Sequence, residues 1–403
     1  MEVLFIGCIY SQLQIDLFQS KSKRGYQYAA QNFQGALVDG FIKCQDTRLK
    51  VLSIPSLSTY PRGCELMTVE DSPFIFDGRE LGKSFGFLNL PFANHLHQSR
   101  IDKFIDDWYS ETEGRKSIVV YAMLKQQMQY AVDAKKRHPD IKLCLVIPDL
   151  PMYMACNKYY KALGLQKRDI KTIEVLLQEF DCYVVLAEPM TRQLNITNKP
   201  YSVIEGIYTD TCPIADNTNK FSGKNIMYAG GIVSRYGVFD LIEAFHRSKN
   251  EDYRLILCGP CPEMEKLNAY LLSDSRIEYR GLIPTADVRK LQRQVTLLVN
   301  PRHSTEEFSK YSFPSKTLEY MASGTPVLMS ELPSMPEDYK QHIFMFADES
   351  VEGMRKEIEK VLSYAEEKLS RKGLQAKSFI LEKKNSQHQV KKIIELLDRT
   401  IYH

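Results

Sequence analysis

The chain has 403 residues, more than one ordinary hydrophobic core accommodates, and this length predicts two domains. Its 44% hydrophobic and 26% charged residues are typical of a globular protein and exclude a disordered chain. The net charge of +3 is too small for a nucleic-acid-binding protein, so we expect no nucleic-acid partner.

The first ten residues, MEVLFIGCIY, have neither the basic region nor the cleavage site of a secretory signal peptide, and we read them as a first buried strand. The longest apolar runs, 118–124 and 143–147, are shorter than the ~18 residues that a membrane span needs. The nine cysteines are scattered, and the single CxxC, Cys258–Cys261, lacks the second pair that a zinc site would use. We expect a cytoplasmic protein, with CGPC as either a strand-to-helix turn or a redox pair.

Short apolar strands alternate with amphipathic helices in the first half of the chain. The predicted strands are 2–9, 48–55, 117–124, 141–148 and 182–187. The predicted helices are 30–42, 98–110, 125–137 and 170–180. Continuously apolar strands that alternate with helices indicate a parallel sheet covered on both faces. Residues 56–96, with several Pro, Gly and aromatic residues, interrupt the alternation and are predicted to form an irregular insertion.

A polar segment, 207–224, is predicted to be a linker, and the alternation restarts after it. The predicted strands are 225–229, 253–258, 277–280 and 296–300, and the predicted helices are 238–247, 262–272, 286–294, 352–365 and 386–398. Thr285 is a plausible N-cap for helix 286–294. The inward side of helix 238–247 carries Val238, Leu241, Ile242 and Phe245.

The fold class is therefore predicted to be α/β, with two Rossmann-like domains that face each other across a cleft. The domains are 1–206 and 225–385, joined by the linker 207–224, and a helix in 386–403 crosses back to the first domain. Ligands of open parallel sheets bind beyond the carboxyl ends of the strands. We expect the site in the cleft between two such edges.

Four strand-to-helix junctions of the second half gather glycine and basic residues. The first, YAGGIVSRYG, holds Gly230 and Gly231, which allow a close approach of the backbone to a ligand. The second, LCGPCP, holds Gly259, and the third is YRGLIP. Each of these three, taken singly, could be an ordinary turn.

The fourth junction, KYSFPSKTLEYMASGTPVL, reads as a short helix before an apolar strand. Ser312 or Ser315 can cap the helix, Pro314 suits its first turn, and Gly324 suits the position after its end.

Lys316 lies in the first turn of this helix, where a cation opposes the helix dipole. Such a cation makes sense if an anion binds there, and a diphosphate is the obvious candidate. Glu319, one turn later, can accept hydrogen bonds from a vicinal diol. The alternative is a surface pair of Lys316 and Glu319 worth ~0.2–0.5 kcal/mol.

Together these stretches resemble the family 4 glycosyltransferases of the GT-B fold, of the type that assembles bacterial surface polysaccharides. The resemblance is strongest from 225 to 328, where YAGGI…YGVFDLIEAF, LILCG, RIEYRGLIP and FPSKTLEYMASGTPVL follow in order. It implies transfer of a sugar, with retention of anomeric configuration, from a UDP- or GDP-linked donor. It also implies no bound metal and no cofactor, because the helix dipole and basic side chains neutralise the diphosphate.

The resemblance also assigns residues. Glu319 matches the second glutamate of the E-x7-E motif of the family, whereas the first falls at Tyr311. The backbone around Leu282 and Ile283 matches the base-contacting region, and the loop with Gly230 and Gly231 matches the phosphate-proximal loop.

The usual basic pair of that loop is missing, so we expect Arg235 and Lys316 to act as the catalytic cations. We also expect Gly259, Ser315 and Thr317 to line the nucleotide-sugar site.

The resemblance implies a glycan, glycolipid or lipid-linked acceptor on the first domain, and contact with the inner face of the cell membrane. Lys21, Lys23 and Arg24 could meet an acceptor phosphate or anionic headgroups there, or could be a solvated loop. Two alternatives remain for the whole protein: a non-catalytic partner that binds a nucleotide sugar, and a GT-B-type epimerase.

Overall fold

The computed structural model describes residues 1–23, 28–90, 98–150, 165–209 and 219–400. The chain divides into two compact units: unit 1 is Met1–Ile207 with Ser386–His403, and unit 2 is Tyr208–Asn385. Among the described residues, no helix combines the length and apolar character that a membrane span requires. Part of the predicted linker, 210–218, and Arg24 lie outside the described residues.

Unit 1 is built on an eight-stranded sheet in the order β10-β9-β8-β7-β1-β2-β5-β4. Its strands are β1 (Glu2–Gly7), β2 (Arg48–Ser53), β4 (Ser72–Phe76), β5 (Arg79–Ser84), β7 (Lys116–Tyr121), β8 (Lys142–Ile147), β9 (Cys182–Val185) and β10 (Tyr201–Val203). A separate two-stranded sheet pairs β3 (Thr68–Val69) with β6 (Phe87–Leu88). The helices are α1 (Ile15–Lys21), α2 (Tyr28–Lys43), α3 (Gln98–Glu111), α4 (Lys125–Arg137), α6 (Leu165–Leu177), α7 (Pro189–Gln193) and α14 (Ser386–Arg399).

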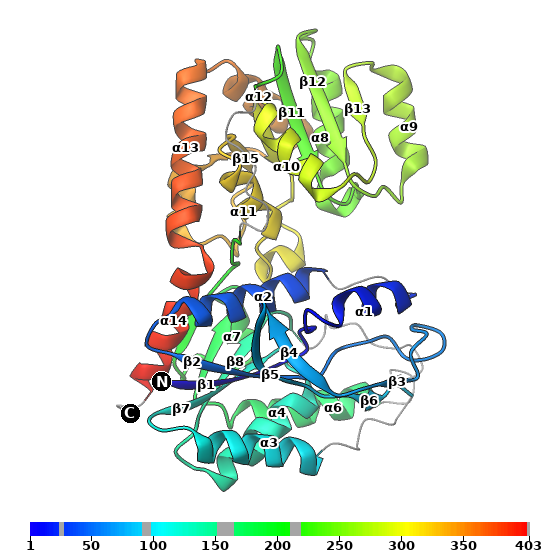
Figure 1. The fold of residues 1–403 in the computed structure, drawn as a ribbon. Coiled ribbons are helices and arrows are strands. Elements are labelled where there is room, and N and C mark those ends of the chain that lie inside the picture. The colour runs from blue at the N-terminus through cyan, green and yellow to red at the C-terminus, as the bar shows by residue number, and fades with distance from the viewer. Residues whose placement is uncertain (24–27, 91–97, 151–164, 210–218, 401–403) are drawn as a thin grey trace. The chain divides into compact units, whose positions relative to one another are not determined.

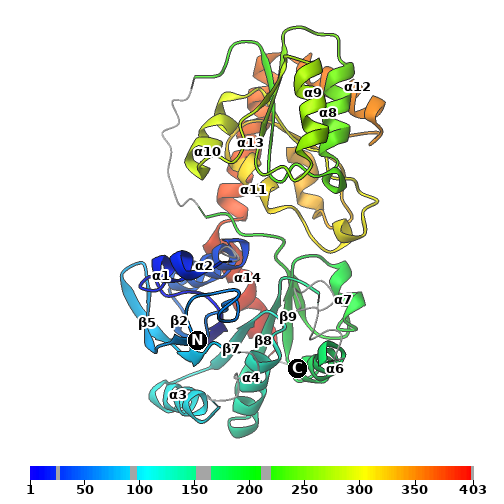
Figure 2. The same cartoon turned by 90° about the vertical axis from the view of Figure 1, so that its right-hand side faces the viewer.

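Helices cover both faces of this sheet (Figures 1 and 2). On one face, α14 packs against α2 and contributes Val390 and Ile393 to a core that includes Val3, Phe5 and Phe41. The central strands are buried along their length because both faces are covered, which explains their continuous apolar sequence.

The insertion 56–96 is not wholly irregular, which corrects the prediction. Within its described residues, β5 pairs in parallel with β2, and β4 pairs antiparallel with β5 through a tight turn at Asp77-Gly78. Both turn residues have positive φ, 48° and 70°. Asp-Gly between strands is a strong hairpin signal, so the sequence did carry this information.

Unit 2 is built on a six-stranded parallel sheet in the order β13-β12-β11-β14-β15-β16. The strands are β11 (Lys224–Ala229), β12 (Tyr253–Cys258), β13 (Ile277–Tyr279), β14 (Leu297–Asn300), β15 (Val327–Met329) and β16 (Phe344–Met345). The α-helices are α8 (Val238–Arg247), α9 (Met264–Ser273), α10 (Thr285–Gln294), α11 (Ser315–Ala322), α12 (Val351–Leu362) and α13 (Glu366–Lys383). The 3₁₀ helices are η2 (Ser234–Tyr236), η3 (Glu307–Lys310) and η4 (Glu337–His342).

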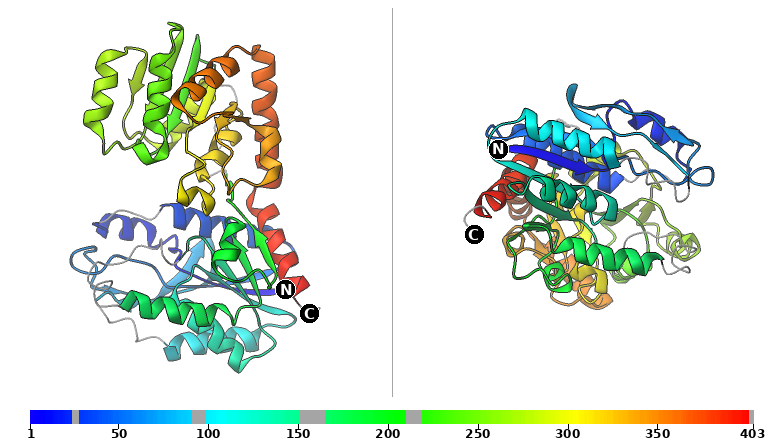
Figure 3. Two further views of the ribbon diagram at one scale, coloured as in Figure 1. Left: turned by 180° about the vertical axis from the view of Figure 1, so that it is seen from behind. Right: turned by 90° about the horizontal axis from the view of Figure 1, so that it is seen from below.

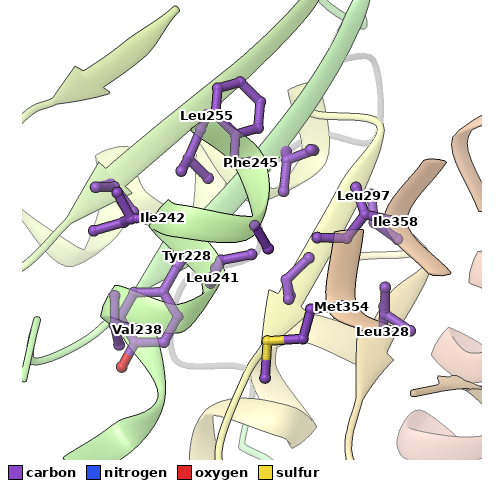
Figure 4. Close-up of a cluster of buried hydrophobic side chains, with 14 of the residues drawn as sticks. Tyr228, Val238, Leu241, Ile242, Phe245, Leu255, Leu297, Leu328, Met354 and Ile358 are labelled. Carbon is purple, nitrogen blue, oxygen red and sulfur yellow. The ribbon is translucent and has the colours of Figure 1, made fainter. Parts of the chain in front are cut away.

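Two apolar cores lie on opposite faces of the unit 2 sheet. Helices α8, α9 and α12 bury their apolar sides against one face, as Figure 4 shows for Leu241, Phe245 and Met354. Helices α10, α11 and α13 bury theirs against the other, and α13 lies beside α11 (Figure 3). The predicted inward stripe of helix 238–247 is confirmed.

Candidate functional site

Three of the four predicted junctions meet at the carboxyl edge of the unit 2 sheet. The Gly230 N–H donates to the Cys258 carbonyl, and the Gly259 N–H donates to the Gly281 carbonyl, each at 2.8 Å. Gly259 has a φ of 127°, and a Cβ there would collide with the Gly230 carbonyl. The neighbouring loops can pack this closely only because glycine stands at Gly259.

The fourth junction reaches the first through α11. The Ala229 N–H donates to the Tyr320 hydroxyl at 2.6 Å, and that hydroxyl donates to the Ala229 carbonyl at 3.0 Å. Tyr320 therefore fastens the end of β11, immediately before Gly230, to α11.

Helix α11 begins differently from the prediction. Pro314 is the N-cap rather than a first-turn residue, and no side chain caps the helix, so neither Ser312 nor Ser315 does so. A proline N-cap has its φ preset by the ring. Likewise, α10 begins at Thr285 and its N-cap is Pro284, so the predicted Thr285 cap is wrong. Gly324 follows the last turn of α11 with a φ of 80°, as predicted.

Lys316 is half-buried and lies directly against the first junction. Its Nζ donates to the Tyr228 hydroxyl at 2.8 Å, and a Cβ added at Gly230 would collide with it. Burial lowers the pKa of Lys316 to about 7, and Arg302 nearby lowers it further in the same direction, whereas Glu319 raises it. The ammonium group is therefore held where its charge is poorly compensated.

Arg235 lies in η2, which follows β11, and Arg302 lies between β14 and η3. The Arg235 guanidinium carbon lies 4.6 Å from the ring centre of Phe308, and that of Arg302 lies 4.8 Å from the same centre. Both also lie 5.5 Å from the ring of Tyr236. Burial lowers the pKa of Arg302, and Arg235 adds to this effect.

These three cations share an unusual property. Within the described residues, Arg235, Arg302 and Lys316 form no ion pair with a carboxylate, although Arg302 donates to the Ser312 carbonyl at 3.2 Å. Arg235 is exposed, whereas Arg302 and Lys316 are half-buried, and half-buried cations are normally paired because an uncompensated charge in a partly dry site is unfavourable. Three together make a site that is complementary to an anion of more than one charge.

Glu319 and Ser315 are exposed on α11, and Leu282 projects from the third junction with 82% of its surface exposed. Although Glu319 is open to solvent, surrounding protein removes enough water to raise the pKa of its carboxyl, against the effects of Arg289 and Lys316. Ile283 is half-buried and packs on the core beside α10 and α11. Gly231 accepts a hydrogen bond from Tyr228 through its carbonyl.

Thr317 does not lie at the surface of the site, contrary to the prediction. Its side chain is fully buried and its hydroxyl accepts from the Asn300 amide at 3.2 Å. The residue therefore belongs to the packing between α11 and β14. Thr317 stands between Lys316 and Glu319 in the sequence, but a helix turns each residue by about 100°, so its side chain lies on a different side of α11.

Several other side chains are free thiols or have local ion-pair partners. Cys258 and Cys261 are free thiols. Glu307 pairs with Lys310 at 2.7 Å, and Lys21 of unit 1 pairs with Glu65 at 3.1 Å. In the parts of the chain that the structure describes, no three His, Cys, Asp or Glu side chains are grouped in a way that could hold a metal ion.

Residues 223–364 match the family model of the glycosyl transferases group 1. Several solved structures are similar in fold over nearly the whole chain. The sucrose-phosphate synthase of Thermosynechococcus elongatus is similar with a TM-score of 0.61 at 13% sequence identity, over 100% of both chains. The fold is GT-B. The same GT-B fold is found in the lipopolysaccharide outer core galactosyltransferase WaaB, with a TM-score of 0.61 at 14% identity over 100% of this chain and 99% of that one. Anabaena HepE in complex with UDP is similar with a TM-score of 0.59 at 14% identity, over 99% of this chain and 100% of that one. No curated protein matches the chain in sequence.

Proposed function

We propose that this GT-B protein is a glycosyltransferase that takes a sugar from a nucleoside-diphosphate donor bound to unit 2. The observation that carries the proposal is the group of three unpaired cations, Arg235, Arg302 and Lys316, beside the glycine junctions. These cations lie within the segment that matches the group 1 glycosyl transferases. The solved structure of HepE, which shares the fold, is a complex with UDP.

In this proposal the three cations bind the diphosphate and stabilise the charge that develops on it as the glycosidic bond breaks. Lys316 and Arg235 were expected from the sequence, and Arg302 joins them. Glu319 accepts hydrogen bonds from the ribose diol, and Leu282 with the Ile283 backbone contacts the base. Gly230, Gly231, Gly259 and Ser315 line the donor with their backbone.

The transfer is proposed to retain the anomeric configuration and to need no bound metal or cofactor. The bond from the anomeric carbon to the donor phosphate oxygen breaks as the acceptor oxygen bonds to the same face of the sugar. The leaving phosphate takes the acceptor proton. This assignment uses the cations to do what Mg²⁺ does in other transferases.

The acceptor is proposed to bind unit 1 and to be a polysaccharide, glycolipid or lipid-linked sugar. WaaB, a galactosyltransferase of the lipopolysaccharide outer core, shares the fold and supports this class. Such an acceptor would bring the protein to the inner face of the cell membrane from the cytoplasm.

Thermal-shift measurements against a panel of UDP-, GDP- and other nucleotide sugars test the proposal. A ligand at about 100 times its dissociation constant stabilises by ~2.7 kcal/mol, which is readily detected. Lys316→Ala should abolish the shift and the transfer, whereas Lys290→Ala, at an exposed lysine of α10, should leave both unchanged. A flat response to every nucleotide sugar would contradict the proposal.

A second candidate function is binding of a nucleotide sugar without transfer. The observation that favours it is Tyr311 at the position of the first motif glutamate. A nucleotide sugar that binds tightly but is never consumed, with any acceptor extract, would select this second function.

A further inference from the structure

The hydroxyl of Tyr228 stands where the first junction and α11 meet. Tyr228 is the second-last residue of β11, and its ring is fully buried in the core between the sheet and α8 (Figure 4). Its oxygen accepts from Lys316 Nζ at 2.8 Å and donates to the Gly231 carbonyl at 3.0 Å. One buried hydroxyl therefore links the lysine to the glycine loop.

These two hydrogen bonds have a fixed direction. A phenol has a single O–H, and here the Gly231 carbonyl takes it, so the oxygen can offer Lys316 only a lone pair. A lone pair is what an ammonium group needs, because all of its hydrogens are donors. Within the described residues, no other hydrogen bond is made by Lys316 Nζ.

We infer that Tyr228 is a positioning residue of the anion site, whose hydroxyl holds Lys316 under Gly230 and keeps its nitrogen in the ammonium form. The inference rests on the proposed function, because it assigns Lys316 to the diphosphate. Tyr228 itself is too deeply buried to contact the donor.

The charged groups around Lys316 and Tyr228 affect how strongly the charge state of Lys316 depends on the Tyr228 hydroxyl. Arg302, from the segment after β14, opposes the charge on Lys316, and Glu319, from α11 itself, favours it. Arg302 and Tyr236 face Tyr228, and burial raises the pKa of the Tyr228 phenol, so it stays neutral. The pKa of Lys316 is about 7, so a small change in its partners alters its charge at neutral pH.

Tyr228→Phe tests the inference with minimal loss of packing. The probe is inorganic pyrophosphate, with its dissociation constant measured by calorimetry from pH 5.5 to 8.5 on the full chain. Hydrogen bonds to charged groups are strong enough that losing this one should lower the pKa of Lys316 by about one unit. The variant should then bind about five-fold more weakly than wild type at pH 7 but nearly equally at pH 5.5.

The matched control is Tyr253→Phe. Tyr253 is a buried tyrosine of the same core and the first residue of β12, whereas Tyr228 lies near the carboxyl end of β11. The dissociation constant of Tyr253→Phe for pyrophosphate should equal that of wild type across the pH range. Circular dichroism should show that both variants are folded. The ionisation of pyrophosphate affects every variant alike, so it cancels when a variant and the wild type are compared at the same pH.

Each outcome has a distinct meaning. A loss of affinity that is nearly absent at pH 5.5, about five-fold at pH 7 and about ten-fold at pH 8.5 supports the inference. An unchanged affinity in Tyr228→Phe, or an equal loss at every pH, overturns the positioning role while leaving the proposed function intact. If the wild type does not bind pyrophosphate at any pH, the proposed function fails and the inference with it.

Discussion

Lys316 is a cation kept in an environment that opposes its charge. In the unfolded chain a lysine titrates near pH 10.4, whereas in the folded protein the pKa of Lys316 is about 7. Between these two values the unfolded state binds more protons than the folded state, so this group makes stability rise with pH over that window. Below pH 7 the full penalty of the half-buried ammonium is present.

Replacing Lys316 by Met should therefore stabilise the folded protein while removing anion binding. The melting temperature of Lys316→Met should exceed that of wild type by a few degrees at pH 6, and the difference should shrink as pH rises towards 10. Melting curves at several pH values check this, with Lys290→Met as the control lysine. A destabilised variant at pH 6 would show that Lys316 is held by favourable contacts and is not reserved for a ligand.

Arg302 should act on the site in two separable ways. Its guanidinium lowers the pKa of Lys316, so Arg302→Gln should move the loss of pyrophosphate affinity to higher pH. The same change removes one of three cations, so affinity at pH 6, where Lys316 is charged in both proteins, should fall about ten-fold. Calorimetric titrations at pH 6 and pH 8 separate the two effects, and a pH profile identical to that of wild type would mean that the two cations do not interact.

The sequence predicted roles for Lys316 and Glu319 because each stands at a definite position of a short helix. Neither Arg302 nor Tyr228 has such a position, although Tyr228 is the first residue of the junction YAGGIVSRYG. Arg302 follows an apolar strand by two residues, and Tyr228 reads as part of a strand. Both reach the site only because parallel strands bring their carboxyl ends to one edge, which is a property of the sheet order.

At the scale of elements, the first three strand-to-helix junctions of the proposed donor site hold three glycines with positive φ, and each should respond differently to Ala. At Gly281 nothing lies within 4 Å of an added Cβ, so Gly281→Ala should cost only about 1–2 kcal/mol of backbone strain. At Gly259 the Cβ meets the Gly230 carbonyl, so the backbone must move and the loss of stability should be larger.

Gly230→Ala should instead damage binding more than packing. The Cβ collides with Lys316 Nζ, the end of a flexible side chain that can move away. Gly259→Ala should therefore show the largest loss of stability in urea unfolding and Gly230→Ala the largest loss of pyrophosphate affinity, whereas Gly281→Ala should change both least. Equal loss of affinity in Gly230→Ala and Gly281→Ala would show that the position of Lys316 does not matter.

Elements were predictable where one local signal dominates. Helix 125–137 was predicted with the observed bounds, because its apolar positions repeat at helical spacing between two buried strands. Helix α13 was missed although it has 18 residues, because no turn signal separates it from α12 apart from a short break at Ser363–Ala365. The Thr285 and Ser315 caps failed because a proline takes the N-cap position in both helices.

At the scale of the whole molecule, the chain enters unit 2 after β10 and returns to unit 1 as α14. The sequence predicted two domains from the restart of the strand–helix alternation. It also predicted a returning terminal helix, and the structure assigns α14 to unit 1, where it buries Val390 and Leu397. The facing arrangement of the two domains stays a prediction.

Because each unit has its own core, calorimetry should resolve two unfolding transitions, only one of which depends on the donor. A nucleoside diphosphate at about 100 times its dissociation constant should raise the transition of unit 2 by about 5–11 °C and leave the other unmoved. Leu397→Ala, which removes a buried side chain of α14, should lower only the unit 1 transition, since it costs ~2–5 kcal/mol there. A single transition that responds to both the nucleotide and Leu397→Ala would show that the two units unfold as one. The assignment of the donor to unit 2 would then rest on the Lys316 and Arg302 variants.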